Sequence, residues 1–486
     1  MKKRSLSLIL SIALLLSVFC FNGCGQKQNK DISNYQITAS LEDNKITGNV
    51  KLDFYNPTDN AFKELKFNLF ANAFRKEAKY SPISAGRHYQ CYYEGESYGG
   101  IEITSVKDDS APLEYSVKGI DKNVLVVNLS EEVFPGERTI VEIDYVITLA
   151  NIISRTGITP KTINLANFYP ILCGIDEQGF YECVYYSTGD PYFSDVSNYT
   201  VTFSYPEEYV VASSGVVKES KVENGVAKTT YSINSARSFC MAISKDYEVI
   251  TDNSLGVTVN YYYYGDSNPK EMLDTAVKSL KYFSNTFGEY PYPSYSVCKT
   301  PFDQGGMEFP AITYISDALE NKAFKEVIVH ETAHQWWQTG VGNNEIEYGF
   351  LDEGLAEYSV VLFYENHPEY GFEREVLVKS SEKTYKTFCS VYDKLFGEVN
   401  TVMIRSLKDF SSEYEYVNVA YVKPCIMYDC LRKTVGEERF FGALKRYYKE
   451  YCFKNASPYD LISAFNKEGC DSEGYFESFF NGSVIL

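Results

Sequence analysis

The pattern of apolar and polar residues changes about halfway along the chain. Between residues 35 and 250, stretches such as KITGNVKLDFY and TIVEIDYVIT alternate β-branched or aromatic residues with polar ones, and Gly, Pro, Asn and Asp separate them. A two-residue period is typical of strands that bury one face. We therefore expect antiparallel sheets, in a sandwich or a saddle, over residues 35–250. The last strand before the pattern changes is expected in residues 256–268.

Beyond that strand, apolar residues recur at the spacing of a helix. Residues 269–288 begin with a proline in the first turn and place Met272 and Ala276 on one face, which predicts an amphipathic helix. Two strands joined by a glycine-containing loop are expected next, and the rest of the chain is expected to be mostly helical. An all-β half before a mostly helical half predicts an α+β fold with two domains, residues 35–250 and 251–486.

The first residues form a processing signal. The basic start MKKR precedes an apolar run, Ser5–Phe21, and the small residue Gly23 stands directly before Cys24. This pattern predicts a lipoprotein-type signal peptide over residues 1–23, with Cys24 as the lipid attachment site, and a polar tether over residues 24–34. We therefore expect an exported protein anchored to the cell membrane. Ordinary secretion and an uncleaved signal anchor are the alternatives.

The composition narrows the range of partners. The chain of 486 residues has a formal net charge of −19, which argues against a nucleic-acid partner because phosphate binding needs clustered Lys and Arg. Ten cysteines lie beyond Cys20 and Cys24, without a CxxC pair or a zinc-ribbon spacing. Pairs such as Cys173 with Cys183 and free buried thiols both remain open, and so does the oligomeric state.

One pentapeptide, HETAH, carries the clearest chemistry. His330 and His334 are four residues apart, so on a helix they lie on one face and can bind one metal ion. Glu331, beside them, is placed to accept a proton from a water molecule that the metal activates. This is the HExxH motif of zinc peptidases. The alternative is a surface helix whose histidines bind nothing.

A catalytic zinc site needs a third protein ligand and one open position. Glu353 lies in the first turn of the next expected helix, after a loop long enough to fold that helix back towards the histidines. Its carboxylate would complete a site for one Zn²⁺ with two histidines and one glutamate. Alone, an acid at this position would be explained equally well by its favourable interaction with the helix dipole.

Four motifs in order resemble those of the aminopeptidase N family of zinc metallopeptidases, and the resemblance covers most of the chain. They are Gly305-Gly306-Met307-Glu308, HETAH, LDEGLAEY around Glu353, and Ala420-Tyr421-Val422-Lys423. The resemblance implies a thermolysin-like catalytic domain in the second half and the short, two-domain form of the family. It also implies that Glu331 is the general base and that Tyr421 hydrogen-bonds the oxyanion of the transition state.

The same resemblance also implies which residues bind the substrate. It implies that Glu308 pairs with the free α-ammonium group of a peptide, and that Gly305, Gly306 and Met307 let the substrate backbone approach. The family's second amine anchor has no clear counterpart, and Asp190 and Glu177 are possible substitutes. The alternative for Glu308 is an acid that faces solvent.

Glu357, one helical turn after Glu353, is expected either to hold the outer nitrogen of a ligand histidine or to lie on a solvated helix face.

The sequence therefore predicts a zinc aminopeptidase that acts on peptides with a free N-terminus. One alternative is a zinc endopeptidase, or another hydrolase of this type, without that requirement. The other is a catalytically silent surface lipoprotein that binds peptides.

Overall fold

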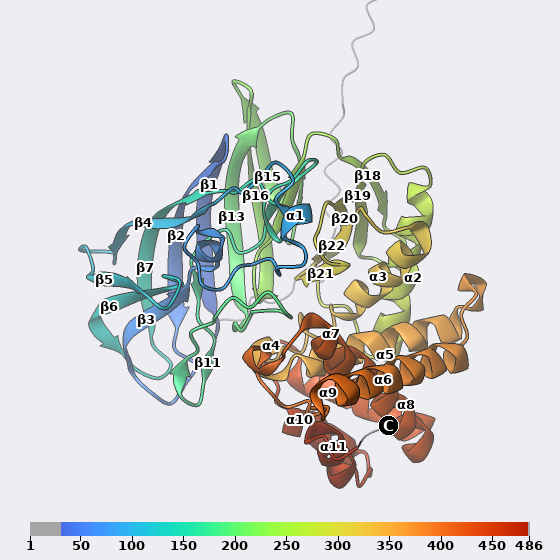
Figure 1. Cartoon of the computed structure of the whole chain (residues 1–486). Helices are drawn as coiled ribbons and strands as arrows, with labels where there is room; N and C mark the ends of the chain where they lie inside the picture. The colour runs from blue at the N-terminus through green and yellow to red at the C-terminus, as the bar shows by residue number, and fades with distance from the viewer. Residues whose placement is uncertain (1–30, 485–486) are drawn as a thin grey trace, which may run out of the picture.

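The alternating stretches of the first half form a seven-stranded sheet (Figure 1). The structure is a computed structural model that describes residues 31–484. In the central hairpin of β1 (Ser33–Glu42) and β2 (Lys45–Tyr55), every second side chain is buried, as a strand with one face against a core requires. The sheet has the order β15-β16-β13-β1-β2-β7-β4, and its other strands are β4 (Gly100–Lys107), β7 (Arg138–Thr148), β13 (Ser197–Pro206), β15 (Val216–Glu223) and β16 (Val226–Ala236).

One pair of neighbouring strands in this sheet, β1 and β13, is parallel. The other pairs are antiparallel, as expected from the sequence. The chain reaches β13 only after it has built parts of other sheets. Parallel neighbours need such a crossover connection, and the local alternation of residues carries no information about it.

Two four-stranded sheets and a small hairpin complete the first domain. Their apolar residues join the core of the large sheet, where the rings of Tyr35 and Tyr199 stack with centroids 4.8 Å apart. The sheet β10-β3-β6-β5 consists of β3 (Phe62–Asn68), β5 (Tyr115–Lys118), β6 (Val124–Val133) and β10 (Ile171–Leu172). The sheet β14-β17-β9-β8 consists of β8 (Thr156–Ile158), β9 (Ile163–Leu165), β14 (Val210–Ser213) and β17 (Met241–Ser244). The hairpin is formed by β11 (Ile175–Asp176) and β12 (Gly179–Phe180). Two short helices, η1 (Phe70–Phe74) and α1 (His88–Cys91), lie in the loops.

The second domain begins with a five-stranded sheet of order β18-β19-β20-β22-β21. Its strands are β18 (Glu248–Asp252), β19 (Thr258–Tyr263), β20 (Ser294–Thr300), β21 (Gly306–Phe309) and β22 (Ile312–Ser316). The strand expected in residues 256–268 is β19, which pairs in parallel with β20 and so belongs to this sheet rather than to the first domain. β21 is an edge strand that pairs with β22 alone.

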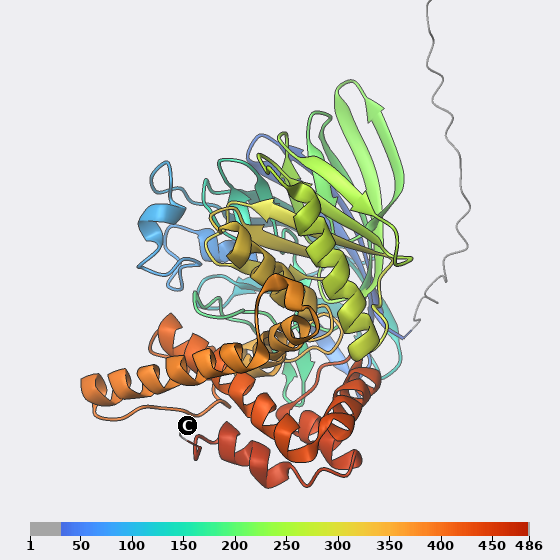
Figure 2. The ribbon, with the colours of Figure 1, turned by 90° about the vertical axis from the view of Figure 1, so that its right-hand side faces the viewer.

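Helices cover this sheet and continue to the end of the described chain. α2 (Pro269–Thr286) and α3 (Asn321–Ala333) pack against the strands (Figure 2), and α5 (Phe350–Asn366) is buried along almost its whole length. The remaining elements are α4 (Glu345–Tyr348), η2 (Pro368–Tyr370), α6 (Arg374–Phe396), η3 (Leu407–Asp409), α7 (Glu413–Tyr416), the π-helical turn η4 (Val417–Val422), α8 (Lys423–Val435), α9 (Glu437–Tyr451), α10 (Pro458–Lys467) and α11 (Glu473–Phe480). The two-domain α+β fold expected from the sequence is therefore confirmed.

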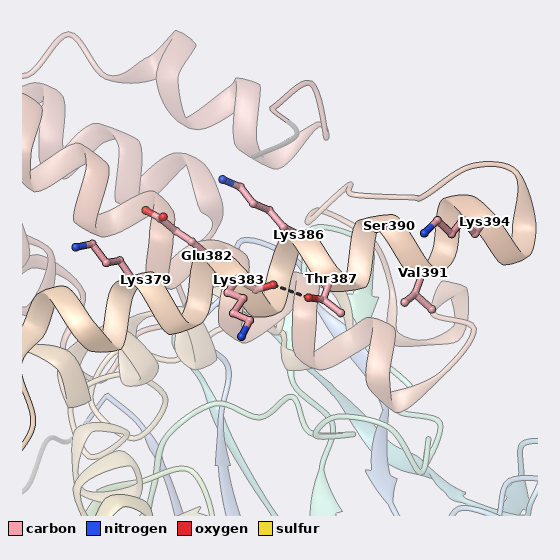
Figure 3. A pocket seen from close by; sticks show the side chains of 8 residues that line it. All are labelled: Lys379, Glu382, Lys383, Lys386, Thr387, Ser390, Val391 and Lys394. Atoms are coloured by element: carbon pink, nitrogen blue, oxygen red, sulfur yellow. Dashed lines mark hydrogen bonds between the residues drawn. The ribbon is translucent and has the colours of Figure 1, made fainter.

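The exposed face of α6 has a shallow depression whose lining includes lysines, among them Lys379 and Lys394 (Figure 3), and α6 projects from the body of the domain (Figure 2). The ten cysteines of the described residues are free thiols, including Cys173 and Cys183.

Within residues 31–484, no helix combines the length and apolar character needed to cross a membrane. The expected signal peptide and Cys24 lie outside the described residues.

Candidate metal centre

Three side chains from two neighbouring helices converge at the end of α3. His330 lies in the last turn of α3 and His334 follows as its C-cap, still in helical conformation. Their Nε2 atoms are 3.1 Å apart, and Glu353 Oε2, from the first turn of α5, is 3.2 Å from each of them. His334 and Glu353 are buried, while the side chain of His330 keeps 14% of its surface exposed. The site is therefore reached from the His330 side.

This arrangement fits a tetrahedral zinc ion. Bonds of 2.0–2.1 Å in a tetrahedron separate the ligand atoms by about 3.3 Å, close to the spacings found here. Two imidazole nitrogens and one carboxylate oxygen are also the donors of a catalytic zinc site that keeps one position open. Burial opposes ionisation of Glu353, but the imidazoles of His334 and His330 outweigh it and hold the pKa of this carboxyl below its usual range. The carboxylate is therefore in its metal-binding form.

The outer nitrogens of both histidines also have partners. His334 Nδ1 lies 2.9 Å from the carbonyl oxygen of Trp337, which fixes the ring with Nε2 towards the metal position. His330 Nδ1 lies 3.4 Å from Glu357 Oε2, so Glu357 takes the first of its two expected roles. Such outer contacts orient a metal ligand and raise its basicity.

Glu331 lies beside this triad and is buried, with Oε2 free of any hydrogen-bond partner among the described residues. Burial raises the pKa of its carboxyl to about 7. The side chain packs directly against the backbone of β21, because a Cβ added at Gly306 would lie 2.4 Å from Glu331 Oε1. Gly306 thus makes room for the carboxylate. At Gly305 the nearest atom to an added Cβ is 3.5 Å away, on Val327.

Tyr421 contacts two members of the triad. Its hydroxyl donates a hydrogen bond to Glu353 Oε1, and its ring stacks on His330 with centroids 5.9 Å apart. Tyr421 sits in the π-helical turn η4, just before Pro424 in α8. Pro424 has no amide hydrogen, so the bond that would close a regular α-helical turn onto residue 420 is missing, and the backbone widens there.

Glu308, on the edge strand β21, is buried rather than solvent-exposed, and its Oε1 has no hydrogen-bond partner among the described residues. Burial, together with the nearby carboxylate of Asp190, raises the pKa of Glu308 well above its usual value. Asp190, Glu308 and Glu345 each direct one carboxylate oxygen into a common space, and these oxygens lie within 4.8 Å of one another. Asp190 comes from the first domain and Glu345 from α4. The cluster therefore spans both domains.

Further side chains hold this cluster in place. Arg155 forms an ion pair with Asp190, with 2.5 Å between Nη2 and Oδ1. Gln338 donates to Glu345 Oε1 over 2.9 Å, and its own backbone has a positive φ of 120°. Gln335 joins the strand of Glu308 to the histidine segment, because its amide donates to the carbonyl oxygen of Phe309 and accepts from the amide of residue 311.

Two expected substrate contacts are placed elsewhere. The side chain of Met307 is buried in a core cluster with Phe302 and Tyr314, so only its backbone at the sheet edge can face a substrate. Strand alternation turns this side chain away from the face of Glu308, so the expectation for Met307 can hold only for its backbone. Glu177 is exposed in the β11–β12 turn and lies outside the cluster, whereas Asp190 is part of it.

Sequence reasoning missed Glu345, Arg155 and both glutamines. Of these four residues, only Gln335 stands directly beside a motif, because it follows the second histidine of HETAH in the sequence. Glu345 and Arg155 come together with Glu308 only through the tertiary fold, and neither stands in a motif of its own.

Comparison with known proteins finds similar peptidases. Residues 271–481 match the model of the peptidase family M1 domain. Aminopeptidase M1-B of Oryza sativa subsp. japonica is 28% identical over 295 residues, which cover 56% of this chain and 32% of that protein. Aminopeptidase N of Haemonchus contortus is 22% identical over 301 residues, 57% of this chain and 30% of that protein. The chain thus matches about a third of the length of these relatives.

The fold as a whole has a solved counterpart. The M1 zinc metallopeptidase from Deinococcus radiodurans aligns over 94% of this chain and 96% of its own, with a TM-score of 0.67 and 16% identity. A mutant of that protein has also been solved with a Tyr-Ser-Ala substrate, with a TM-score of 0.65, 17% identity, and coverage of 94% of this chain and 95% of that one.

The fold matches that of a two-domain zinc metallopeptidase, and His330, His334 and Glu353 form a group that fits one zinc ion. The second domain, over residues 271–481, is thus similar to the peptidase family M1 domain.

Proposed function

We propose that this protein is a zinc-dependent aminopeptidase, which hydrolyses the N-terminal peptide bond of peptides that carry a free α-amine. The observation that carries this proposal is the position of Glu308. It is buried beside the metal ligands, one of its oxygens has no partner among the described residues, and two further carboxylates face the same space. Buried carboxylates without partners favour a cationic ligand.

The spacing of the three carboxylates suits an ammonium group. An ammonium has three N–H donors in a tetrahedral arrangement, and hydrogen bonds of about 2.8 Å would separate the three acceptor oxygens by about 4.6 Å. The oxygens of Asp190, Glu308 and Glu345 lie within 4.8 Å of one another. We infer that Asp190 and Glu345 share the α-ammonium with Glu308. Because the cluster adjoins the metal ligands, an amine held there would leave the first peptide bond nearest to Glu331.

The chain's own groups supply the remaining steps. When bound, zinc lowers the pKa of a coordinated water and polarises a carbonyl. Glu331 accepts the proton of the attacking water at its unpartnered Oε2 and passes it to the leaving amine. The hydroxyl of Tyr421 donates to the oxyanion that develops on the scissile carbonyl. The edge strand β21 offers free backbone groups along which an extended peptide can pair.

The names of the relatives support this activity in outline, since the matching plant and nematode proteins are aminopeptidases. The runner-up is a zinc endopeptidase, for which the buried carboxylate cluster would have no purpose. A catalytically silent peptide-binding protein is less well supported, because the three metal-binding side chains and Glu331 are all in place.

The test compares one peptide with a free amine and the same peptide N-acetylated. We expect kcat/KM to fall at least 100-fold on acetylation, and Glu308→Gln to remove most of this preference. Equal rates on both substrates would contradict the aminopeptidase proposal and favour the endopeptidase. No turnover by a protein that contains one zinc per chain would favour the silent binding protein.

We also propose that the protein is exported and lipid-anchored at Cys24. The support is the leader pattern of the sequence alone. Metabolic labelling with a palmitate analogue should mark the wild-type protein and not the variant Cys24→Ser.

A further inference from the structure

The cluster of Asp190, Glu308 and Glu345 brings three buried carboxyl groups to one space. The three side chains are at most 6% exposed, and Glu308 Oε1 and Glu345 Oε2 have no hydrogen-bond partner among the described residues. Their carboxylates, if ionised, carry three negative charges. Among the described residues, Arg155 is the one ion-pair partner of the three, through Asp190.

Without a ligand, protons can neutralise this cluster, because burial raises the pKa of Glu308 and that of Glu345 well above their usual value. A bound peptide brings one positive charge, its α-ammonium, and a divalent cation brings two. Because a buried carboxylate needs a compensating charge, either ligand would take the place of these protons.

The donor atoms indicate the class of ion. All three are carboxylate oxygens, which suit hard cations rather than zinc or copper. Calcium binds oxygen at 2.3–2.6 Å, so oxygens on opposite sides of the ion are roughly 4.6–5.2 Å apart. The oxygens of the cluster lie within 4.8 Å of one another, inside that span. Magnesium demands a stricter octahedron and gives up its waters reluctantly.

We propose that the cluster of Asp190, Glu308 and Glu345 is a second metal site, which binds a Ca²⁺-like divalent cation when no peptide is present. This inference rests on the proposed function, because the ion takes the place that the α-ammonium of the substrate would use. The cation and the peptide therefore exclude each other. The bound ion is then a competitive inhibitor of peptide binding.

Binding is tested on the zinc-loaded protein with Ca²⁺ as the probe. Calorimetric titration should show one Ca²⁺ per chain, at least tenfold weaker binding in Glu345→Gln, and unchanged binding in Glu177→Gln, whose side chain is exposed in the β11–β12 turn. Alaninamide, which carries a free α-amine, should weaken Ca²⁺ binding, and N-acetylalaninamide should not. If Glu345→Gln does not fold, Asp190→Asn serves as the second variant.

Kinetics provide the second readout. Ca²⁺ should raise the KM of a free-amine substrate in proportion to its concentration, with kcat unchanged. The inference is overturned if the zinc-loaded protein binds no Ca²⁺ at 10 mM, on the order of ten times the weakest usual affinity. It is also overturned if Glu345→Gln binds Ca²⁺ as wild type does. A protein that cleaves free-amine peptides but binds no second ion contradicts this inference alone, while one that binds the ion and cleaves nothing contradicts the proposed function alone.

Discussion

At the scale of single residues, surroundings give three buried glutamates different roles. Glu353 is held ionised by the two imidazoles, so it is suited to bind a metal. Glu331 has a pKa raised to about 7 by burial, near that of an effective general base. Burial and Asp190 raise the pKa of Glu308 well above its usual value, so this carboxyl is protonated unless a cation lies beside it. The same kind of side chain is thus suited to three purposes.

Glu331 and Glu357 flank the same ligand histidine, and their variants separate catalysis from metal binding. We expect Glu331→Gln to lower kcat by roughly 10²–10⁴-fold with one zinc per chain retained, because proton transfer is lost. Glu357→Gln should instead weaken zinc affinity by about 10–100-fold, because it loosens the contact with His330 Nδ1. Turnover with added zinc and metal content by mass spectrometry distinguish the two. Full turnover by Glu331→Gln would refute its role as the base.

Lys423 makes stability depend on pH. Its buried ammonium donates to the carbonyl oxygens of Thr401 and Phe479, and burial lowers its pKa to about 8. Between pH 8 and the unfolded value near 10.4, the unfolded chain binds more protons than the native one, so this lysine makes stability rise with pH. The full effect is at most about 3 kcal/mol. Urea unfolding should show that wild type gains stability relative to Lys423→Met between pH 8 and 10; a constant difference would argue against it.

At the scale of elements, the spacing of apolar residues correctly predicted the helices that depend on local sequence. α2, α3 and α5 appear where apolar spacing and a first-turn proline indicated helices, and HETAH lies at the end of α3. The sheet of β19 and the parallel pairing of β13 could not be predicted, because both depend on partners distant in the chain. For the same reason, the place of Glu345 in the site could not be predicted from the sequence. The π turn at Tyr421 has a local cause in Pro424, but the sequence alone does not show that the helix runs through this proline.

The close contact of β21 with α3 can be tested at its glycines. In Gly306→Ala the new methyl would meet the flexible carboxylate end of Glu331, 2.4 Å away, so the carboxylate must move. We expect kcat to fall at least tenfold, while the free energy of unfolding changes by only about 1 kcal/mol. Gly305→Ala is the matched control, since its methyl would have 3.5 Å of space and should leave kcat unchanged. Similar losses in both variants would contradict this explanation.

At the scale of the whole molecule, the first domain completes a site that the second domain mostly builds. Asp190 and its partner Arg155 belong to the first domain and face Glu308 of the second. The relative position of the domains therefore sets the geometry of the cluster. Arg237, directly after β16, is buried between them and donates to the carbonyl oxygens of Gln338 and Lys454 and to the side chain of Asn455.

Arg237 thus couples domain contact to the amine site, because the Gln338 whose carbonyl it holds also donates to Glu345. In Arg237→Met those carbonyl oxygens lose their donor in a buried interface, which should cost about 3–5 kcal/mol. We expect lower stability in urea, together with a higher KM for free-amine peptides and a smaller preference over acetylated ones. Arg138→Met is the control, since Arg138 pairs with Asp53 within the first domain and its side chain is 31% exposed. A loss of stability with the amine preference intact would show that Arg237 holds the domains together without positioning Glu345.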